Sequence, residues 1–186
     1  MKFSVLSDSL EKMESTTKRI ELTDILVELL KNTHASIISK VIYLIQGKIR
    51  PNFEGVELGI AEKLVIRAIS KSSGITTKKI EDDYNDGGDL GKTGANILRQ
   101  KTQTTFTAET ITLERVYDTL LKISKLEGKG SQDMKMKYIS SLLNDATPIE
   151  SKFILKILLG TLRLGIAENT TMDALAIAFT NEKSNR

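Results

Sequence analysis

A repeated motif constrains this chain of 186 residues more than any other feature. Residues 58–62, with the sequence LGIAE, recur identically at 164–168, an offset of 106 residues (164 minus 58). Upstream of each copy stands a Gly-x-apolar-Arg motif, at 47–50 and again at 160–163, and here the offset is 113 residues (160 minus 47). Two shared motifs in the same order are hard to explain by chance, and we interpret them as an internal duplication.

The difference between the two offsets corresponds to an insertion at residues 51–57 in the first copy. The repeat therefore predicts two related halves, roughly residues 1–80 and 111–186, joined by a loop-rich linker at 82–110. Because 186 residues is an ordinary length for one domain, we expect both halves to belong to a single domain, 1–186.

Helical periodicity dominates both halves, since apolar residues recur every three to four positions. Aromatic residues make up only 5% of the chain, which argues against a β-sandwich. We therefore predict an all-α fold. The expected helices lie at residues 18–31, 35–46, 59–71, 112–126, 132–143, 149–162 and 172–180.

The linker contains two motifs that resemble ligand-binding loops. Residues 91–93 (GKT) resemble the end of a phosphate-binding loop, but Asp86 stands where that loop needs its first glycine. Residues 82–89 resemble a calcium loop, but Tyr84 stands where that loop needs a carboxylate-type ligand and Thr93 stands where it needs a bidentate glutamate. We interpret both as ordinary polar sequence.

Composition excludes several classes of chemistry. The chain has no cysteine, which excludes disulfides, zinc–thiolate sites and thiol nucleophiles, and it has a single histidine, His34. Because no paired-carboxylate or nucleophile-elbow pattern is present, we predict no catalytic residues and no metal site. No apolar run approaches the roughly 18 residues of a membrane span, and the N-terminus turns polar too early for a signal peptide, so we expect an intracellular protein.

Basic residues of the second half suggest phosphate binding, although the net charge of +3 is too small to indicate a nucleic-acid partner by itself. On a helix that continues through residue 164, Lys152, Lys156 and Arg163 share one stripe, and Gly160 borders it. A solvated basic face is the simpler alternative. The chain then leaves the helix near Gly165, and another helix is expected to begin near Asn169.

Glycine-flanked turns at helix starts favour contact with a sugar-phosphate backbone, because helix N-termini attract anions. Residues 128–132 (GKGSQ) form such a turn, and residues 15–19, ending in Arg19, are its counterpart in the first half. Scarce aromatics disfavour single-strand binding, and no helix carries side chains suited to reading base edges. The residues thus indicate sequence-independent binding of duplex DNA, and a helical protein-interaction scaffold without DNA affinity is the alternative.

The same motifs resemble a known family. Residues 160–168 (GTLRLGIAE), followed by 173–176 (DALA), resemble the signature of the N-terminal DNA-binding domain of ATP-dependent DNA ligases of the archaeal and eukaryotic replicative type. Residues 55–59, 88–91 and 128–133 are similar to that family in the right order. The resemblance covers essentially the whole chain and is strongest to archaeal members.

The resemblance implies an all-helical domain of two pseudo-two-fold related halves that binds nicked double-stranded DNA on the minor groove, in replication, repair and recombination. Thr161 stands where other members often have lysine. The resemblance, combined with the glycine turns and the basic stripe described above, gives the expected DNA contacts: Gly160, Arg163, Gly165, Ala167, Asn169, Arg19, Gly128, Lys129, Gly130, Ser131, Lys152 and Lys156.

The resemblance also implies partners and cofactors that belong to a longer protein. Archaeal members carry a sliding-clamp (PCNA) binding segment, matched here by Gln100, Lys101 and Phe106 without a paired aromatic, so a plain polar loop is the alternative. The family's catalytic domains use ATP, Mg²⁺ and a lysine in a Lys-x-Asp-Gly motif. This chain has no such motif, so we expect it to hold DNA without sealing it.

Overall fold

The computed structural model describes residues 1–56, 58, 60–100, 109–180 and 182, and this part of the chain confirms the all-α prediction. Its one β-type pairing, within these ranges, is a bridge between Lys2 and Thr112. Two short 3₁₀ helices are present, η1 (Ala35–Ile37) and η2 (Asn52–Glu54). The α-helices are α1 (Phe3–Glu14), α2 (Arg19–Lys31), α3 (Ile38–Ile45), α4 (Glu62–Ser73), α5 (Thr77–Gly87), α6 (Leu90–Arg99), α7 (Leu113–Ser124), α8 (Ser131–Asp145), α9 (Pro148–Leu158) and α10 (Glu168–Thr180).

Local sequence signals explain several helix starts. Thr147 and Glu150 form a reciprocal capping box at the start of α9, with proline at the first helical position. Thr112 accepts a hydrogen bond from the backbone N–H of Arg115 and caps α7 in the same way. Helix α1, like α5 and α6, was not expected from the sequence; its side chains Phe3, Leu6, Leu10 and Met13 are fully buried and follow a helical spacing.

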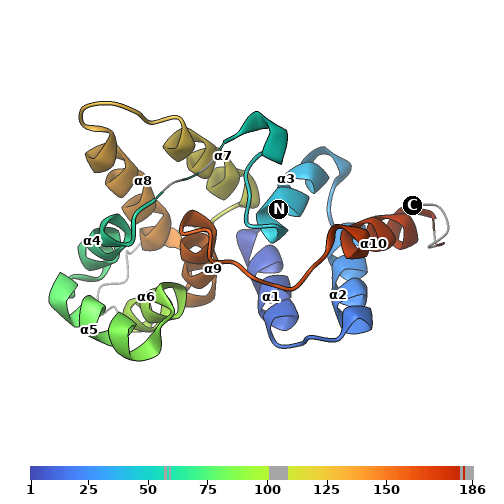
Figure 1. Ribbon diagram of the computed structural model, residues 1–186, viewed down its shortest axis with the longest axis horizontal. Helices are drawn as coiled ribbons and strands as arrows, with labels where there is room; N and C mark the ends of the chain where they lie inside the picture. Colours follow the sequence, from blue (N-terminus) through green and yellow to red (C-terminus); the bar gives the residue numbers. More distant parts are fainter. Residues whose placement is uncertain (57, 59, 101–108, 181, 183–186) are drawn as a thin grey trace.

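The helices group around one continuous apolar core. Figure 1 shows α1, α2, α3 and α10 at one end of the molecule and α4, α5, α6, α8 and α9 at the other, with α7 between them. Within this arrangement α10 packs on α2, and α4 packs on α8. The last helix of each predicted half therefore packs against a helix of the other half, so the halves interlock instead of standing apart.

The centre of the molecule shows a reciprocal contact between the halves. The backbone N–H of Phe3 donates to the carbonyl of Ile111 (3.0 Å), and the N–H of Leu113 donates to the carbonyl of Met1 (2.9 Å). Helices α1–α4 of the first half correspond in order to α7–α10 of the second. When each residue is replaced by its counterpart, the first of these hydrogen bonds becomes the second, and the second becomes the first. This is the pattern that a two-fold relation between the halves would give, and it supports the interpretation as a duplication.

The prediction of a loop-rich linker at 82–110 is wrong for residues up to 99, because α5 continues to Gly87 and α6 follows at Leu90. Asp89 caps α6 by accepting a hydrogen bond from the N–H of Lys92. The glycines that suggested a loop allow close helix packing instead. A Cβ on Gly91 would lie 2.7 Å from Cγ of Lys156, and one on Gly94 would collide with Leu155, so α6 lies directly against α9.

No helix in the described part of the chain is long and apolar enough to cross a membrane.

Candidate nucleic-acid interface

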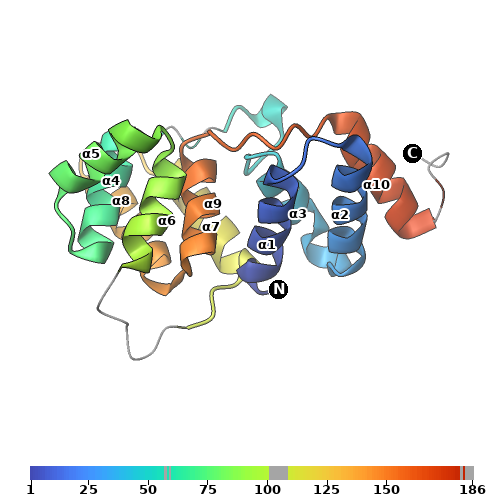
Figure 2. The same ribbon diagram turned by 90° about the horizontal axis from the view of Figure 1, so that it is seen from below.

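Four interhelical segments gather along one edge of the molecule. They are residues 15–18, 46–61, 125–130 and 159–167, which connect α1 to α2, α3 to α4, α7 to α8 and α9 to α10. Figure 2 shows the first, second and fourth of these along its upper edge. The helices that follow these segments begin at this edge, so their free N–H groups point toward it, which favours anions there.

The two Gly-x-apolar-Arg motifs form the same turn. Gly47 ends α3 with φ +69°, and Gly160 ends α9 with φ +64°. In both turns the next N–H reaches five residues back: Lys48 N–H to the carbonyl of Tyr43 (2.8 Å), and Thr161 N–H to that of Lys156 (2.9 Å). This helix ending requires a left-handed residue, which explains the glycine in both copies. The repeat is thus also a repeat of backbone geometry.

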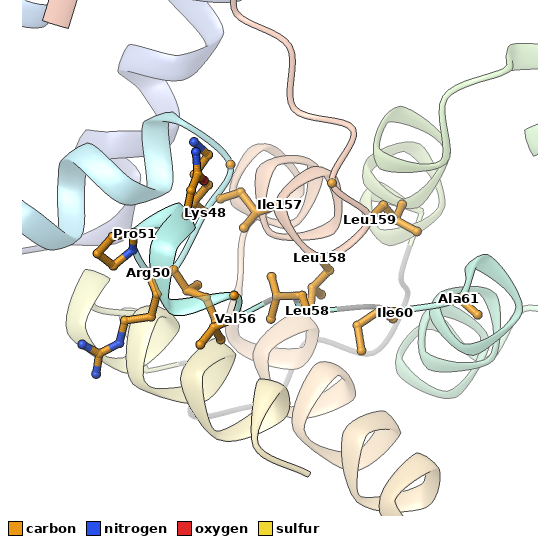
Figure 3. Close-up of a pocket in the computed structure, with 15 residues that line it drawn as sticks. Lys48, Arg50, Pro51, Val56, Leu58, Ile60, Ala61, Ile157, Leu158 and Leu159 are labelled. Carbon is orange, nitrogen blue, oxygen red and sulfur yellow. The ribbon is translucent and has the colours of Figure 1, made fainter. Parts of the chain in front are cut away.

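The two copies also touch each other. A Cβ on Gly47 would lie 3.4 Å from Cβ of Leu162, so the first turn packs against the second copy. Between them lies a hollow of about 670 Å³, lined by residues 47–52, 55, 56, 58, 60 and 61 of the first copy and by residues 157–160 of the second. Figure 3 shows Leu58 and Leu158 among its apolar lining residues, contributed by the two copies.

A second hollow brings the third segment to the same edge. Arg50, Glu54, Gly55 and Val56 line it from one side, and residues 121–127 at the end of α7 line it from the other. The turn at 128–130 follows immediately after these residues. The structure therefore places the predicted turn of the second half beside the insertion of the first.

Arg163 is exposed on this edge, where its Nη1 donates to the carbonyl of Leu162 at 3.2 Å. Arg50 is its counterpart in the repeat and was missed as a site residue. Its side chain is 38% exposed and lies 3.8 Å from Glu54. The signal that could have found Arg50 was the repeat itself, since the two motifs align glycine with glycine and arginine with arginine.

The expectation that the chain leaves a helix near Gly165 is wrong, because α9 ends at Leu158, whereas the expectation that another helix begins near Asn169 is confirmed by α10. Gly165, Ala167 and Asn169 are all exposed. The carbonyl of Ala167 accepts the N–H groups of Thr170 (2.9 Å) and Thr171 (3.2 Å), which opens α10 one residue before Asn169. A segment in which exposed residues alternate with the buried Leu162 and Leu164 thus leads from one helix end to the next helix start along the edge.

Arg19 is the first residue of α2, and it reaches across to α10. Its Nη2 donates to Oδ2 of Asp173 at 3.1 Å; the arginine side chain is 61% exposed, whereas Asp173 is 1% exposed. A buried carboxylate thus orients the guanidinium while its other N–H groups face solvent. This arrangement presents a positioned cation at the edge.

The turn before α8 is open to solvent. Gly128, Lys129 and Gly130 are exposed, Gly130 occupies the N-cap position, and Ser131 is the first residue of the helix. This matches the predicted glycine turn into a helix N-terminus.

The prediction that Lys152 and Lys156 share an exposed stripe with Arg163 is wrong. Helix α9 ends at Leu158, because the turn at Gly160 stops it, so Arg163 does not lie on the same helical face. Lys152 and Lys156 are buried, 8% and 5% exposed. A periodicity argument places residues on a common face but cannot tell whether another helix covers that face, and here α1 and α6 do.

The two lysines belong to a charge cluster with Glu11, Glu14 and Asp89. Lys152 pairs with Glu11 at 2.6 Å and with Glu14 at 2.5 Å; Lys156 pairs with Glu14 and, at 2.9 Å, with Asp89. The cluster joins the end of α1 and the N-cap of α6 to α9. It is a structural feature of the core, which removes the reason for assigning these two lysines to DNA.

The ionisation of the cluster follows from burial and pairing. Burial raises the pKa of Glu14, but the hydrogen bonds from both lysines outweigh it and the pKa lies below its ordinary value. The pKa of Asp89 is lowered in the same way, by Lys156 and the N–H of Lys92 against the effect of burial. Burial lowers the pKa of Lys156, but its two carboxylate partners outweigh this and raise it.

The predicted clamp-binding residues fall at the end of α6 and beyond. Gln100 is exposed at the C-cap of α6, whereas Lys101 and Phe106 lie outside the described residues. Within the described residues, no group of three or more acidic or histidine side chains is placed to hold a metal ion.

A family description, DNA ligase N terminus, matches residues 2–176 of the chain. The chain belongs to this family. It is 72% identical over its whole length to a DNA ligase of Nitrosopumilus maritimus, 66% identical to one of Cenarchaeum symbiosum, and 44% identical over 99% of its length to DNA ligase 2 of Thermofilum pendens. The chain spans about a third of the length of these relatives, 32% in each case.

These similarities confirm the resemblance to archaeal DNA ligases that the motifs indicated. The motif at 160–168 that carried the resemblance forms the segment between α9 and α10 on the shared edge.

Proposed function

We propose that this family member binds duplex DNA, with a nick as its target, through the edge formed by the four interhelical segments. The observation that carries the proposal is the pair of equivalent glycine turns at that edge, each followed by an arginine, Arg50 in the first copy and Arg163 in the second. Arg19 and the open turn at 128–131 add a positioned cation and a helix N-terminus.

Duplex geometry supports this assignment. The two strands of a duplex are related by local two-fold axes, so a binding face with two related turns presents one arginine to each backbone. At Gly160 no atom stands within 4 Å of the position that a Cβ would occupy, so a sugar-phosphate backbone can approach the turn closely there. Contacts of this kind recognise sugar and phosphate rather than base edges, so the binding is independent of sequence.

The relatives are named DNA ligase, and the chain corresponds to about a third of their length. We propose that it holds nicked DNA for catalytic domains of a longer ligase that use ATP and Mg²⁺, in replication, repair and recombination. A sliding clamp bound near Gln100 remains a further prediction. The chain lacks the Lys-x-Asp-Gly motif that such catalysis needs, so the proposed role here is DNA holding.

Fluorescence anisotropy tests the proposal. Labelled nicked, intact and single-stranded DNA of equal length are titrated with the chain at several salt concentrations. We expect duplex binding, weaker single-strand binding, and a negative slope of log K against log salt of about 0.9 for each phosphate contacted. No duplex binding even at low salt would leave the alternative, a helical protein-interaction scaffold.

The Arg163→Ala variant tests the interface itself. Loss of a charge-assisted contact is expected to weaken binding by about 1–3 kcal/mol, and Arg50→Ala by a similar amount. Arg99→Ala is the matched control, because Arg99 is exposed at the other end of α6, away from the shared edge. Equal affinities of Arg163→Ala, Arg99→Ala and the wild type would reject the edge as the DNA-binding face.

A further inference from the structure

The insertion at 51–57 is the part of the edge that has no counterpart in the second copy. In the structure it forms η2, and two backbone hydrogen bonds close it: Glu54 N–H to the carbonyl of Pro51 and Gly55 N–H to that of Asn52, both 3.1 Å. Pro51 restricts the entry of the chain into this turn. The insertion is therefore a compact, defined projection.

The tip of this projection is Phe53, whose side chain is 89% exposed, more than that of any other large apolar residue described. An exposed phenylalanine gives up the hydrophobic stabilisation that burial of its ring would provide. Most other large apolar side chains of the described residues are buried or half-buried, and the next most exposed, Ile20 and Phe179, are 78% and 55% exposed, so packing within the described chain does not explain Phe53.

Its position points to DNA. Arg50, Gly55 and Val56, which flank Phe53 in the chain, line both hollows of the edge, the one shared with Gly160 and the one shared with the end of α7. The projection thus lies between the end of α9 at Gly160, where the segment at 159–167 begins, and the end of α7, which leads into the turn at 128–131. An aromatic side chain between two backbone contacts on a duplex faces the groove that separates them.

We propose, building on the DNA-binding function above, that Phe53 is an apolar wedge that enters the minor groove beside the nick. Apolar side chains that enter this groove separate stacked bases and bend the duplex. At a nick one strand has no phosphodiester bond across the step, so separation is easier there than in intact duplex. Phe53 thereby confers preference for nicked over intact DNA.

The wedge also gives the complex one orientation. The paired turns are equivalent and would accept a duplex in either direction, but a nick marks one strand only. Because the insertion occurs in one copy, Phe53 lies on one side of the two-fold relation. It therefore separates bases on one side of the nick and leaves the other side stacked.

The experiment compares Phe53→Ala with the wild type, using nicked duplexes that carry 2-aminopurine 5′ or 3′ of the nick. This base fluoresces more strongly when it is unstacked. For the wild type we expect brightening on one side only and a preference for nicked over intact duplex on the order of tenfold. Phe53→Ala should lose the brightening and the preference for nicked DNA. It should keep the affinity for intact duplex and the salt dependence of that binding.

Phe179→Ala is the matched control, because Phe179 is also exposed, at 55%, but lies near the far end of α10. Unchanged nick preference and brightening in Phe53→Ala would overturn the wedge, and equal brightening on both sides would overturn the single orientation. Wild-type duplex binding without any brightening would mean that Phe53 contacts something other than bases. Absence of wild-type duplex binding would instead refute the underlying function.

Discussion

Lys156 offers the sharpest test of what holds the DNA-binding edge in place. It is 5% exposed, pairs with Glu14 at the end of α1 and with Asp89 at the start of α6, and its carbonyl accepts the N–H of Thr161 in the turn at Gly160. Lys156→Met keeps the length and apolar stem of the side chain but removes its charge. The two carboxylates then lose a partner.

The size of the effect follows from burial. Removing one partner of a buried ion pair costs about 3–5 kcal/mol, because the remaining charge is left uncompensated. Here Glu14 keeps Lys152 as a partner, and Glu14 and Asp89 are 24% and 26% exposed, so water screens part of the loss. We expect a loss of about 2–3 kcal/mol, or about 4–12 °C in Tm for a chain of this length.

The pH dependence gives an independent check. The pKa values of Glu14 and Asp89 in the folded state lie below the ordinary 4.5 and 3.8. Their contribution to the free energy of unfolding is therefore complete above the ordinary pKa values and is lost as the pH falls through the lowered folded-state pKa values. The pKa of Lys156 is raised above 10.5, so the contribution of Lys156 to the free energy of unfolding is complete below pH 10.5 and is lost as the pH rises through the raised folded-state pKa. The difference in unfolding free energy between the wild type and Lys156→Met should therefore be largest between about pH 5 and 10 and should become smaller in acid.

Urea unfolding followed by helical circular dichroism measures this difference at pH 7 and pH 3.5. Lys71→Met is the matched control, because Lys71 is an exposed lysine on α4. Equal unfolding free energies for the two variants at pH 7 would refute the argument, as would a difference that stays constant into acid.

Two further predictions concern α6 and catalysis. Gly94→Ala should lower the unfolding free energy by about 1–3 kcal/mol, because the new Cβ overpacks against Leu155. In the control Gly87→Ala the nearest atom to the new Cβ lies at 3.9 Å, so the unfolding free energy should stay unchanged or rise slightly. Thermal melts compare the two variants, and equal melting temperatures would contradict the close approach of α6 to α9. Incubation with ATP and Mg²⁺ should give no lysine–AMP adduct by mass spectrometry, and detection of one would contradict the DNA-holding role.

The residues that the sequence placed correctly are those whose role is local. Gly47 follows the helix expected at 35–46 and ends it, because a left-handed position needs glycine, and Thr147 caps the helix expected from residue 149; the equivalent turn at Gly160 was missed, since the helix was expected to continue through residue 164. Such signals act over a few residues and can be read directly from the chain. The family signature at 160–168 depends on the same local requirement, which is why it was recognisable without a structure.

The errors occur where two helices meet. Gly91 and Gly94 suggested a loop because glycine weakens helices, but the approach of α9 makes their lack of a side chain a packing requirement. Lys152 and Lys156 suggested a basic surface, but α1 and α6 cover that face and supply carboxylates. Neither outcome is encoded within the helix that carries the residue.

The sequence alone thus determined that the chain is helical, that it is built from a repeat, and that each copy carries a Gly-x-apolar-Arg motif. The tertiary structure decided which charged residues are exposed, paired the two turns on one edge, and placed the insertion that carries the exposed Phe53 beside them. Helix formation and helix endings depend on neighbours three to five positions away, whereas burial depends on residues such as Glu14 and Lys156 that lie 142 positions apart in the chain.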